Sequence, residues 1–119
     1  MNGHVDNYGR ALAVRVRLSD IAAVHETQAW IDTGFNGHLV LPQQQIDDLA
    51  LPQSGTVKGI LADGSEVALK RYTCLIDWFG EEHELEVVAN KGEYALLGVG
   101  LLGGHDLHIS YRTGEITID

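Results

Sequence analysis

Several residue types are scarce in this sequence, and each shortage excludes a class of protein. A single cysteine, Cys74, occurs among 119 residues, so no disulfide can form within the chain and a reducing, cytoplasmic location is expected. Eight basic residues against seventeen acidic ones give a formal net charge of −9 at pH 7, which disfavours nucleic acids and anionic membranes as partners. No apolar run approaches the roughly 20 residues that a membrane-spanning helix needs. Residues 1–6 also lack the basic and apolar regions of a signal peptide.

Proline is scarce as well, whereas glycine is abundant, and this contrast indicates the fold class. The chain has two prolines and 14 glycines, and tight turns between strands often require glycine. Hydrophobic residues make up 45% of the chain, close to the globular average, and no linker or repeat interrupts it. We therefore expect one domain, residues 1–119, that is rich in strands and turns.

Alternation of apolar and polar residues predicts strands in the first half of the chain. It runs from Ala11 to Leu18, where the even positions are apolar. Further strands are expected at Val24–Ile31 and His38–Leu41. The segment from Ala11 to Leu18 has the pattern of a half-buried strand.

Three turn signals predict hairpins in the second half. They stand at Asp63-Gly64, at Gly80 and at Thr113-Gly114, each between two strand patterns. For Asp63-Gly64 we expect a two-residue turn of type I′, with positive φ at both residues.

Helix signals are brief. Pro42 suits the first residue of a helix, and Gln43–Leu49 continues the pattern until Pro52 stops it. Residues 100–103 are expected to hold one more helical turn. The whole pattern predicts an all-β fold, a small, closed and mostly antiparallel domain with one or two short helices.

The segment Trp30-Ile31-Asp32-Thr33-Gly34 combines residue types that catalysis can use. Trp30 and Ile31 are expected to bury the strand that leads to the Asp32 carboxylate. Thr33 can lock the loop through its side chain, and Gly34 allows backbone or substrate to approach closely. A purely structural turn is the alternative, because Asp, Thr and Gly all favour turns.

The order of motifs along the chain resembles that of the retropepsin-like aspartic proteases, single-domain relatives of pepsin and of the retroviral proteases. Their pattern is an apolar strand entering Asp-Thr-Gly, a glycine-turned hairpin, two apolar residues followed by glycine, a short helix and a closing strand. The matching segments are Trp30–Gly34, Asp63-Gly64, Leu96-Leu97-Gly98, Val99–Leu102 and His105–Ser110. The resemblance extends from Leu12 to Asp119 and looks strongest to small bacterial members, which often carry Asp-Thr-Gly-Phe and Leu-Ala-Asp-Gly.

This resemblance implies a closed retropepsin-like β-barrel and an aspartic endopeptidase that acts on peptide or protein substrates. In such enzymes two carboxylates share one proton, so that one acts as base on a water molecule while the other acts as acid. Only Asp32 is followed by Thr or Ser and then by Gly, so one chain supplies half a site and a two-fold homodimer is implied. Water is the nucleophile, so no cofactor and no metal are expected.

The resemblance also assigns supporting residues. Thr33, Gly34 and Gly98 would fix the catalytic loop, and Phe35 and Asn36 would face the substrate cleft. The flap that closes over an extended peptide would consist of Leu61, Ala62, Asp63, Gly64 and Ser65.

Three positions depart from the retroviral pattern. Retroviral members have Ala or Ser after Asp-Thr-Gly, then an acidic residue that pairs with an Arg following the later glycine. Here these positions are Phe35, Asn36 and Val99, so the ion pair is absent at both ends. Phe35 is large enough either to narrow a neighbouring pocket or to pack inward.

Other functional interpretations are less well supported by the sequence. The segment His105–His108 has two histidines and an aspartate without further converging ligands, which favours surface histidines over a metal site. Cys74 is expected to be a buried thiol, and Trp30 and Trp78 are expected to belong to the core. The main alternative function is a non-catalytic dimeric module of the same fold that binds peptide or protein by strand addition.

Overall fold

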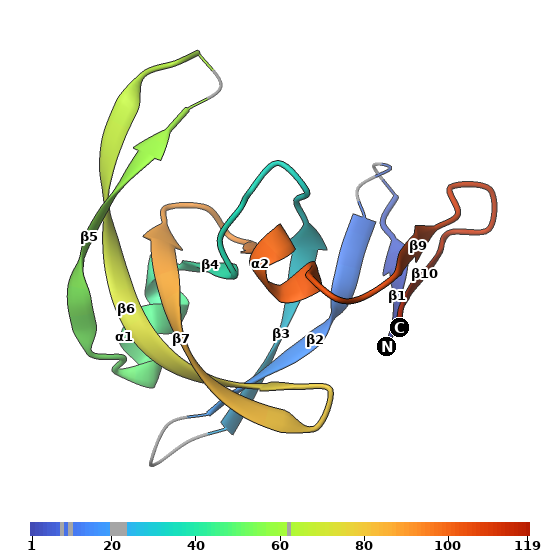
Figure 1. Cartoon of the computed structure of the whole chain (residues 1–119), viewed down its shortest axis with the longest axis horizontal. Helices are drawn as coiled ribbons and strands as arrows, with labels where there is room; N and C mark the ends of the chain where they lie inside the picture. The colour runs from blue at the N-terminus through green and yellow to red at the C-terminus, as the bar shows by residue number, and fades with distance from the viewer. Residues whose placement is uncertain (8, 10, 20–23, 62) are drawn as a thin grey trace.

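The computed structural model describes residues 1–7, 9, 11–19, 24–61 and 63–119, with only the backbone described at 12–19 and 24. These residues form ten strands and two short helices (Figure 1). The strands are β1 (Asn2–Val5), β2 (Ala11–Ser19), β3 (Val24–Ile31), β4 (Leu39–Pro42), β5 (Gln53–Ile60), β6 (Glu66–Trp78), β7 (Glu81–Asn90), β8 (Ala95–Leu97), β9 (Leu107–Ile109) and β10 (Glu115–Ile118). The helices are α1 (Gln43–Leu49) and α2 (Val99–Leu102).

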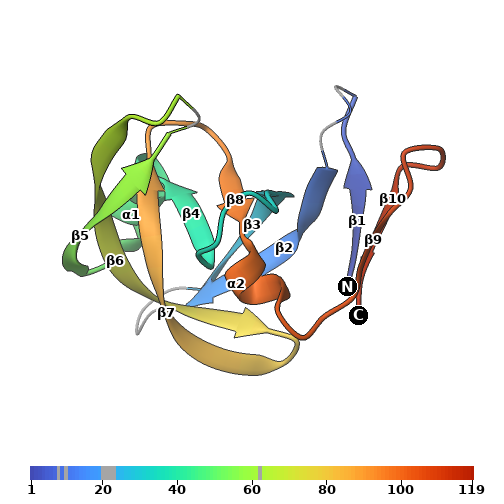
Figure 2. The ribbon, with the colours of Figure 1, turned by 45° about the horizontal axis from the view of Figure 1, so that its top comes forward.

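The strands are hydrogen-bonded in the order β5-β6-β7-β4-β8-β3-β2-β1-β10-β9. A further ladder joins β2 to β6, where Leu18 lies opposite Ile76. The pairings from β6 through β7, β4, β8, β3 and β2 therefore return to β6, and Figure 2 shows the strong curvature of these strands.

Most elements lie where the sequence patterns predict them. Strand β3 has the predicted bounds, β2 continues one residue further, to Ser19, and α1 begins directly after Pro42. The prediction of a mostly β fold with one or two short helices is confirmed. Strand β1 is not predicted, because its four residues are too few to show an alternating pattern.

The three-residue strand β8 positions the loop that contains Asp32. It pairs in parallel with β3, placing Ile31 opposite Leu97, and antiparallel with β4, placing Leu39 opposite the same Leu97. The chain that leaves β3 and returns as β4 must therefore pass around the end of β8. As a result, two loops distant in the sequence meet at this end of the sheet.

The core lies between the curved strands and α1. From Tyr72 to the end of β6 every second side chain is buried, namely Tyr72, Cys74, Ile76 and Trp78, as period-two alternation requires. The expectation of a buried Cys74 thiol is confirmed, since 2% of the residue is exposed. Helix α1 contributes Ile46 and Leu49 to the same cluster. Among the described residues, no polar or charged residue is buried.

In the described part of the chain, no helix combines the length and the apolar character needed to cross a membrane.

Replacing Ile76 by alanine is expected to destabilise the protein by about 2–5 kcal/mol, because the residue is fully buried and its removal leaves a cavity. Urea unfolding monitored by tryptophan fluorescence measures this change. The matched control is Ile60→Ala, since Ile60 is 75% exposed and its truncation should change the free energy of unfolding by no more than about 0.5 kcal/mol. Equal effects of the two substitutions would contradict the described core.

Candidate active site

Asp32 directly follows β3, and hydrogen bonds fix both its main chain and its side chain. Its N–H donates to the carbonyl of Leu97 over 2.9 Å, which extends the pairing with β8 by one step. Its carboxylate oxygen Oδ1 accepts a 3.0 Å hydrogen bond from the N–H of Gly34, and its carbonyl accepts one of 3.1 Å from Phe35. This compact turn fixes the rotation of the half-buried carboxylate.

The turn after β8 is hydrogen-bonded to the loop after Asp32 through main-chain groups. The N–H groups of Gly98, Val99 and Gly100 donate to the carbonyls of His38, Phe35 and Gly37 over 3.0, 2.9 and 2.9 Å. Three consecutive donors thus point at one loop. The two loops form a single unit, and Asp32 lies at its start.

This loop contact requires glycine. A Cβ atom on Gly98 would lie 2.3 Å from the carbonyl oxygen of Gly37 and 2.7 Å from that of Phe35. A Cβ on Gly100 would lie 2.8 Å from the same Gly37 oxygen. Since real Cβ atoms do not approach backbone oxygens so closely, these positions exclude any larger residue at the described geometry.

The ring of Phe35 packs inward against the two loops. A Cβ on Gly37 would meet the ring at 2.4 Å, and a Cβ on Gly98 would meet it at 2.5 Å, so the ring covers both glycines. Phe35 is half-buried and does not line the cavity beside Asp32. The ring thus lies against its own loop and against the turn that follows β8. Asn36 is exposed in the same loop.

A cavity of about 440 Å³ opens beside Asp32 and Thr33. Its other walls are mainly apolar and come from Gly9, Ala11, Trp30, Ile31, Leu96, Ile109 and Tyr111. Trp30 is half-buried, rather than a core residue as predicted, and its ring stacks on that of Tyr94 at a centroid distance of 4.4 Å. The sequence contains a signal for its position, because residues two apart on a strand share a face, which puts Trp30 on the face of Asp32. Tyr94 and Tyr111 lie far away in sequence, so no local pattern indicates them.

A second cavity, of about 430 Å³, lies between the tip of the β6–β7 hairpin and α2. Trp78 is buried there as predicted, and Phe79 stacks on His105 at a centroid distance of 4.4 Å. Within the described residues, no three His, Cys, Asp or Glu side chains are grouped so that they could hold a metal ion.

The predicted site residues Leu61, Asp63, Gly64 and Ser65 lie at the tip of the β5–β6 hairpin, which Figure 1 shows standing out from the body of the molecule. We call β5, β6 up to Arg71 and the connecting residues the flap hairpin. Two apolar side chains are exposed near its tip, since Ile60 is 75% and Leu61 49% exposed. Ala62 lies outside the described residues.

The turn at the tip differs from the expected two-residue type I′ turn. The N–H of Leu61 donates to Ser65, and the N–H of Gly64 donates to Leu61, so the connection is longer than two residues. Gly64 has φ of +86°, whereas Asp63 does not have a positive φ. The prediction was wrong because the Asp63 carboxylate accepts hydrogen bonds from both the N–H and the hydroxyl of Ser65, which stabilises another turn.

The same hydrogen bonds lower the pKa of the Asp63 carboxyl below its ordinary value of 3.8, with the Ser65 hydroxyl as the largest cause and the Ser65 N–H as the next. A lowered pKa stabilises the folded turn above pH 3.8, and this contribution is lost only as the pH falls through the folded pKa. The tip of the flap hairpin therefore keeps this turn at neutral and mildly acidic pH.

The fold is similar to that of known proteases. No family model matches the sequence, and no curated protein matches it. Among solved structures, a retropepsin-like aspartic protease from Rickettsia conorii matches over 99% of this chain and 88% of its own, with a TM-score of 0.68 and 15% identity. The EIAV protease in complex with the inhibitor HBY-793 matches over 82% and 88%, with a TM-score of 0.56 and 18% identity. The simian foamy virus protease matches over 75% and 89%, with a TM-score of 0.53 and 20% identity.

The chain has a retropepsin-like fold. The resemblance inferred from the sequence is thus confirmed at the level of the fold. Within this retropepsin-like fold, the structure brings Asp32, Thr33 and Gly34 together with Phe35 and Gly98. The described residues of the predicted flap, Leu61, Asp63, Gly64 and Ser65, lie on the projecting hairpin.

Replacing Gly98 by alanine is expected to destabilise the retropepsin-like fold by about 2–3 kcal/mol or more, because the added methyl group meets main-chain oxygens that cannot move independently. Gly103→Ala is the matched control. A Cβ at Gly103 meets only the Val99 carbonyl, at an ordinary 3.7 Å, so stability should change by no more than about 0.5 kcal/mol. Thermal unfolding of both variants measures the difference, and a Gly98→Ala protein as stable as the control would contradict the described loop contact.

Proposed function

We propose that this chain is an aspartic endopeptidase that works as a two-fold homodimer, with Asp32 of each subunit forming the catalytic pair. The observation that carries the proposal is the fixed Asp32-Thr33-Gly34 turn beside an apolar cavity in a retropepsin-like fold. A fold alone does not establish an activity. The proposal therefore depends on this aspartate and its surroundings.

The chemistry requires a second carboxylate next to Asp32. Two carboxylates about 3 Å apart cannot both ionise cheaply, so the pair holds one proton. The ionised member removes a proton from water, whose oxygen attacks the peptide carbonyl, and the protonated member donates to that carbonyl oxygen. The proton taken from water is then passed to the leaving amine as the C–N bond of the peptide breaks. Because no other aspartate in the chain is followed by Thr or Ser and then Gly, the second carboxylate comes from a second copy.

The neighbouring residues have matching roles. The N–H of Gly34 orients the Asp32 carboxylate, and Gly98 allows the two loops to meet. Thr33 lines the cavity beside Asp32 and supports the loop. The apolar cavity suits an apolar side chain of the substrate near the bond that is cleaved.

The flap hairpin is proposed to cover the bound peptide. Leu61, Ala62, Asp63, Gly64 and Ser65 are its contact residues, and Asn36 faces the same cleft. The circuit of strand pairings supports the proposed closed barrel of residues 1–119. Neither a cofactor nor a metal takes part in this mechanism, and a cytoplasmic location agrees with the single, buried Cys74.

The alternative of a non-catalytic module that binds by strand addition is not favoured. It leaves the fixed Asp32 carboxylate without a role.

Asp32→Asn is expected to abolish peptide cleavage while leaving the fold intact. The amide oxygen of asparagine can still accept the Gly34 hydrogen bond, but the side chain cannot hold the titrating proton. Cleavage of a peptide library, read by mass spectrometry, measures activity, and circular dichroism checks the fold. Asp48→Asn, on the exposed side of α1, is the matched control and should cleave like the wild type. Cleavage by a pure, folded Asp32→Asn protein would overturn the assignment.

Turnover per subunit is expected to fall as the protein is diluted through its dimer dissociation constant, because a monomer holds one Asp32. Sedimentation and turnover measured on the same samples test this. Two copies joined by a flexible linker should stay active at concentrations where the untethered protein is inactive. The same tandem with Asp32→Asn in one copy should be inactive. Activity of that tandem, or undiminished turnover of a proven monomer, would exclude a shared site.

A further inference from the structure

The flap hairpin leaves the sheet at a defined point. Strand β6 pairs with β7 from Arg71 onward, beginning with Arg71 opposite Val88. In the described pairings, residues 66–70 of β6 have β5 as their only neighbour. Val88 also lies opposite Val40 of β4, so β7 belongs firmly to the body of the sheet. Arg71 is therefore the residue at which a two-stranded hairpin meets the multi-stranded sheet.

Strand β5 is irregular at the same level. Gln53 lies opposite Tyr72 and Gly55 lies opposite Arg71, so the register shifts by one residue at Ser54. Such a bulge bends a strand and turns the extra side chain away from its usual direction. The flap hairpin thus joins the body of the sheet at Ser54 on β5 and at Arg71 on β6.

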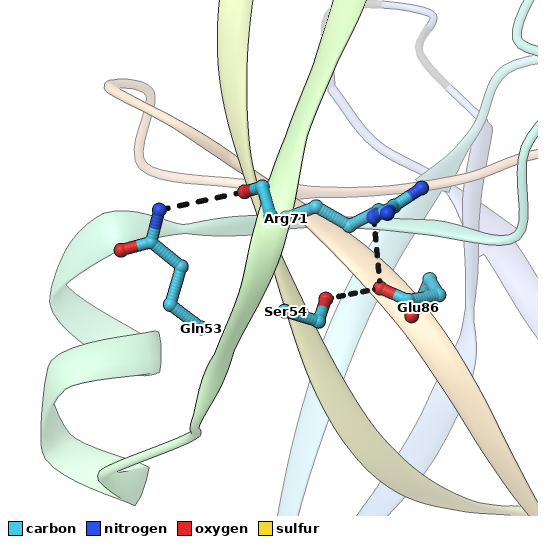
Figure 3. A network of polar contacts seen from close by, with 5 residues as sticks. Gln53, Ser54, Arg71 and Glu86 are labelled. Atoms are coloured by element: carbon cyan, nitrogen blue, oxygen red, sulfur yellow. Dashed lines mark hydrogen bonds and ion pairs between the residues drawn. The ribbon is translucent and has the colours of Figure 1, made fainter.

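Three polar side chains connect the strands at this junction (Figure 3). Arg71 Nε lies 3.2 Å from Glu86 Oε2, and the hydroxyl of Ser54 donates to the same carboxylate oxygen. Glu86 belongs to β7, so one carboxylate joins both strands of the flap hairpin to the body. Gly55 makes room for this contact, because a Cβ there would lie 3.2 Å from Arg71 Nη2.

The cluster lies on the outer face of the sheet. On β6 and β7 the buried side chains are those of alternate residues such as Tyr72 and Val87, whereas Arg71 and Glu86 occupy the opposite face. The Arg71 and Glu86 side chains are 39% and 48% exposed. Substitutions in this cluster therefore leave the core packing untouched, while they change the link between hairpin and body.

We propose that Ser54, Arg71 and Glu86 form a clamp at the base of the flap hairpin, and that these positioning residues hold the hairpin in register over the cleft. This inference rests on the proposed function only where it concerns peptide binding. The clamp restricts the bending of residues 56–70 relative to β7. Loss of the clamp increases the population of hairpin conformations that cannot contact a peptide, so it weakens binding more than it slows the chemical step.

Hydrogen exchange of the ligand-free protein tests the clamp without any reference to activity. Glu86→Gln removes the charge but keeps an oxygen that can accept from Ser54, and Ser54→Ala removes only the hydroxyl. Each substitution is expected to raise the exchange rates of peptides covering residues 56–70 by about fivefold, the scale of one partly exposed polar contact. Exchange in β3 and β8 should stay unchanged.

The matched control is Glu66→Gln. Glu66 also forms a cross-strand ion pair in the hairpin, with Lys58 at 3.4 Å, but this pair lies beyond the junction and is highly exposed. Its loss should change exchange of residues 56–70 by less than about twofold. Salt supplies a second comparison, because it screens the ion pair between Arg71 and Glu86. Raising the ionic strength should increase hydrogen exchange of the flap hairpin in the wild type and in Ser54→Ala. The increase should be much smaller in Glu86→Gln, where the ion pair is already gone.

Peptide turnover by the same variants connects the clamp to function. Glu86→Gln is expected to raise KM several-fold with kcat within about twofold of the wild type, because the Asp32 loop is untouched. Flap exchange equal to that of the wild type in both Glu86→Gln and Ser54→Ala, or a rise that is uniform across β3, β8 and the hairpin, would overturn the clamp. A wild type that cleaves no peptide would overturn the proposed function instead, while the exchange data would still decide the clamp.

Discussion

The structure depends on a main-chain contact between two loops. The loop after β3 and the turn after β8 are joined by three hydrogen bonds, and the carbonyl of Gly37 occupies the space in which side chains of Gly98 and Gly100 would lie. This contact fixes where β3 and β8 end relative to one another. Since Asp32 is the first residue after β3, this contact positions its main chain, and the N–H of Gly34 then orients its carboxylate.

Within one chain, the Asp32 turn and the flap hairpin differ in how firmly they are held. The Asp32 turn is hydrogen-bonded within itself and to Leu97, in the interior of the sheet. The flap hairpin beyond Arg71 has two strands, two exposed apolar side chains near its tip and one polar cluster at its base. Segments with few buried contacts open at low free-energy cost. Such a division is what a protease of this kind needs, because the reacting groups must be fixed while the peptide must enter and leave.

Local patterns in the sequence predict the parts of this fold that depend on local interactions. The course of β2 follows from alternation, α1 from Pro42 and its polar start, and the Asp32 turn from its own three residues. The tip of the flap hairpin could not be predicted from Asp63-Gly64, because the side chain of Ser65 stabilises a different turn. The stacking of Trp30 on Tyr94 and the place of Tyr111 in the cavity depend on how distant strands pair. A sequence pattern states which residues share a face of a strand, but it does not state what that face meets.

The chain departs from the retroviral pattern at Phe35, Asn36 and Val99, yet the two loops at these positions are joined. The retroviral pattern that the chain resembles joins these loops with an ion pair between side chains. Here the N–H of Val99 donates to the carbonyl of Phe35, and the Phe35 ring covers the two glycines at the junction. A main-chain hydrogen bond can form whatever the side chain, so it leaves no motif in the sequence. The two glycines at the junction do leave a signal in the sequence, since the close approach of the two loops excludes any other residue there. The contact between the two loops therefore depends on main-chain groups and on the absence of side chains at Gly98 and Gly100.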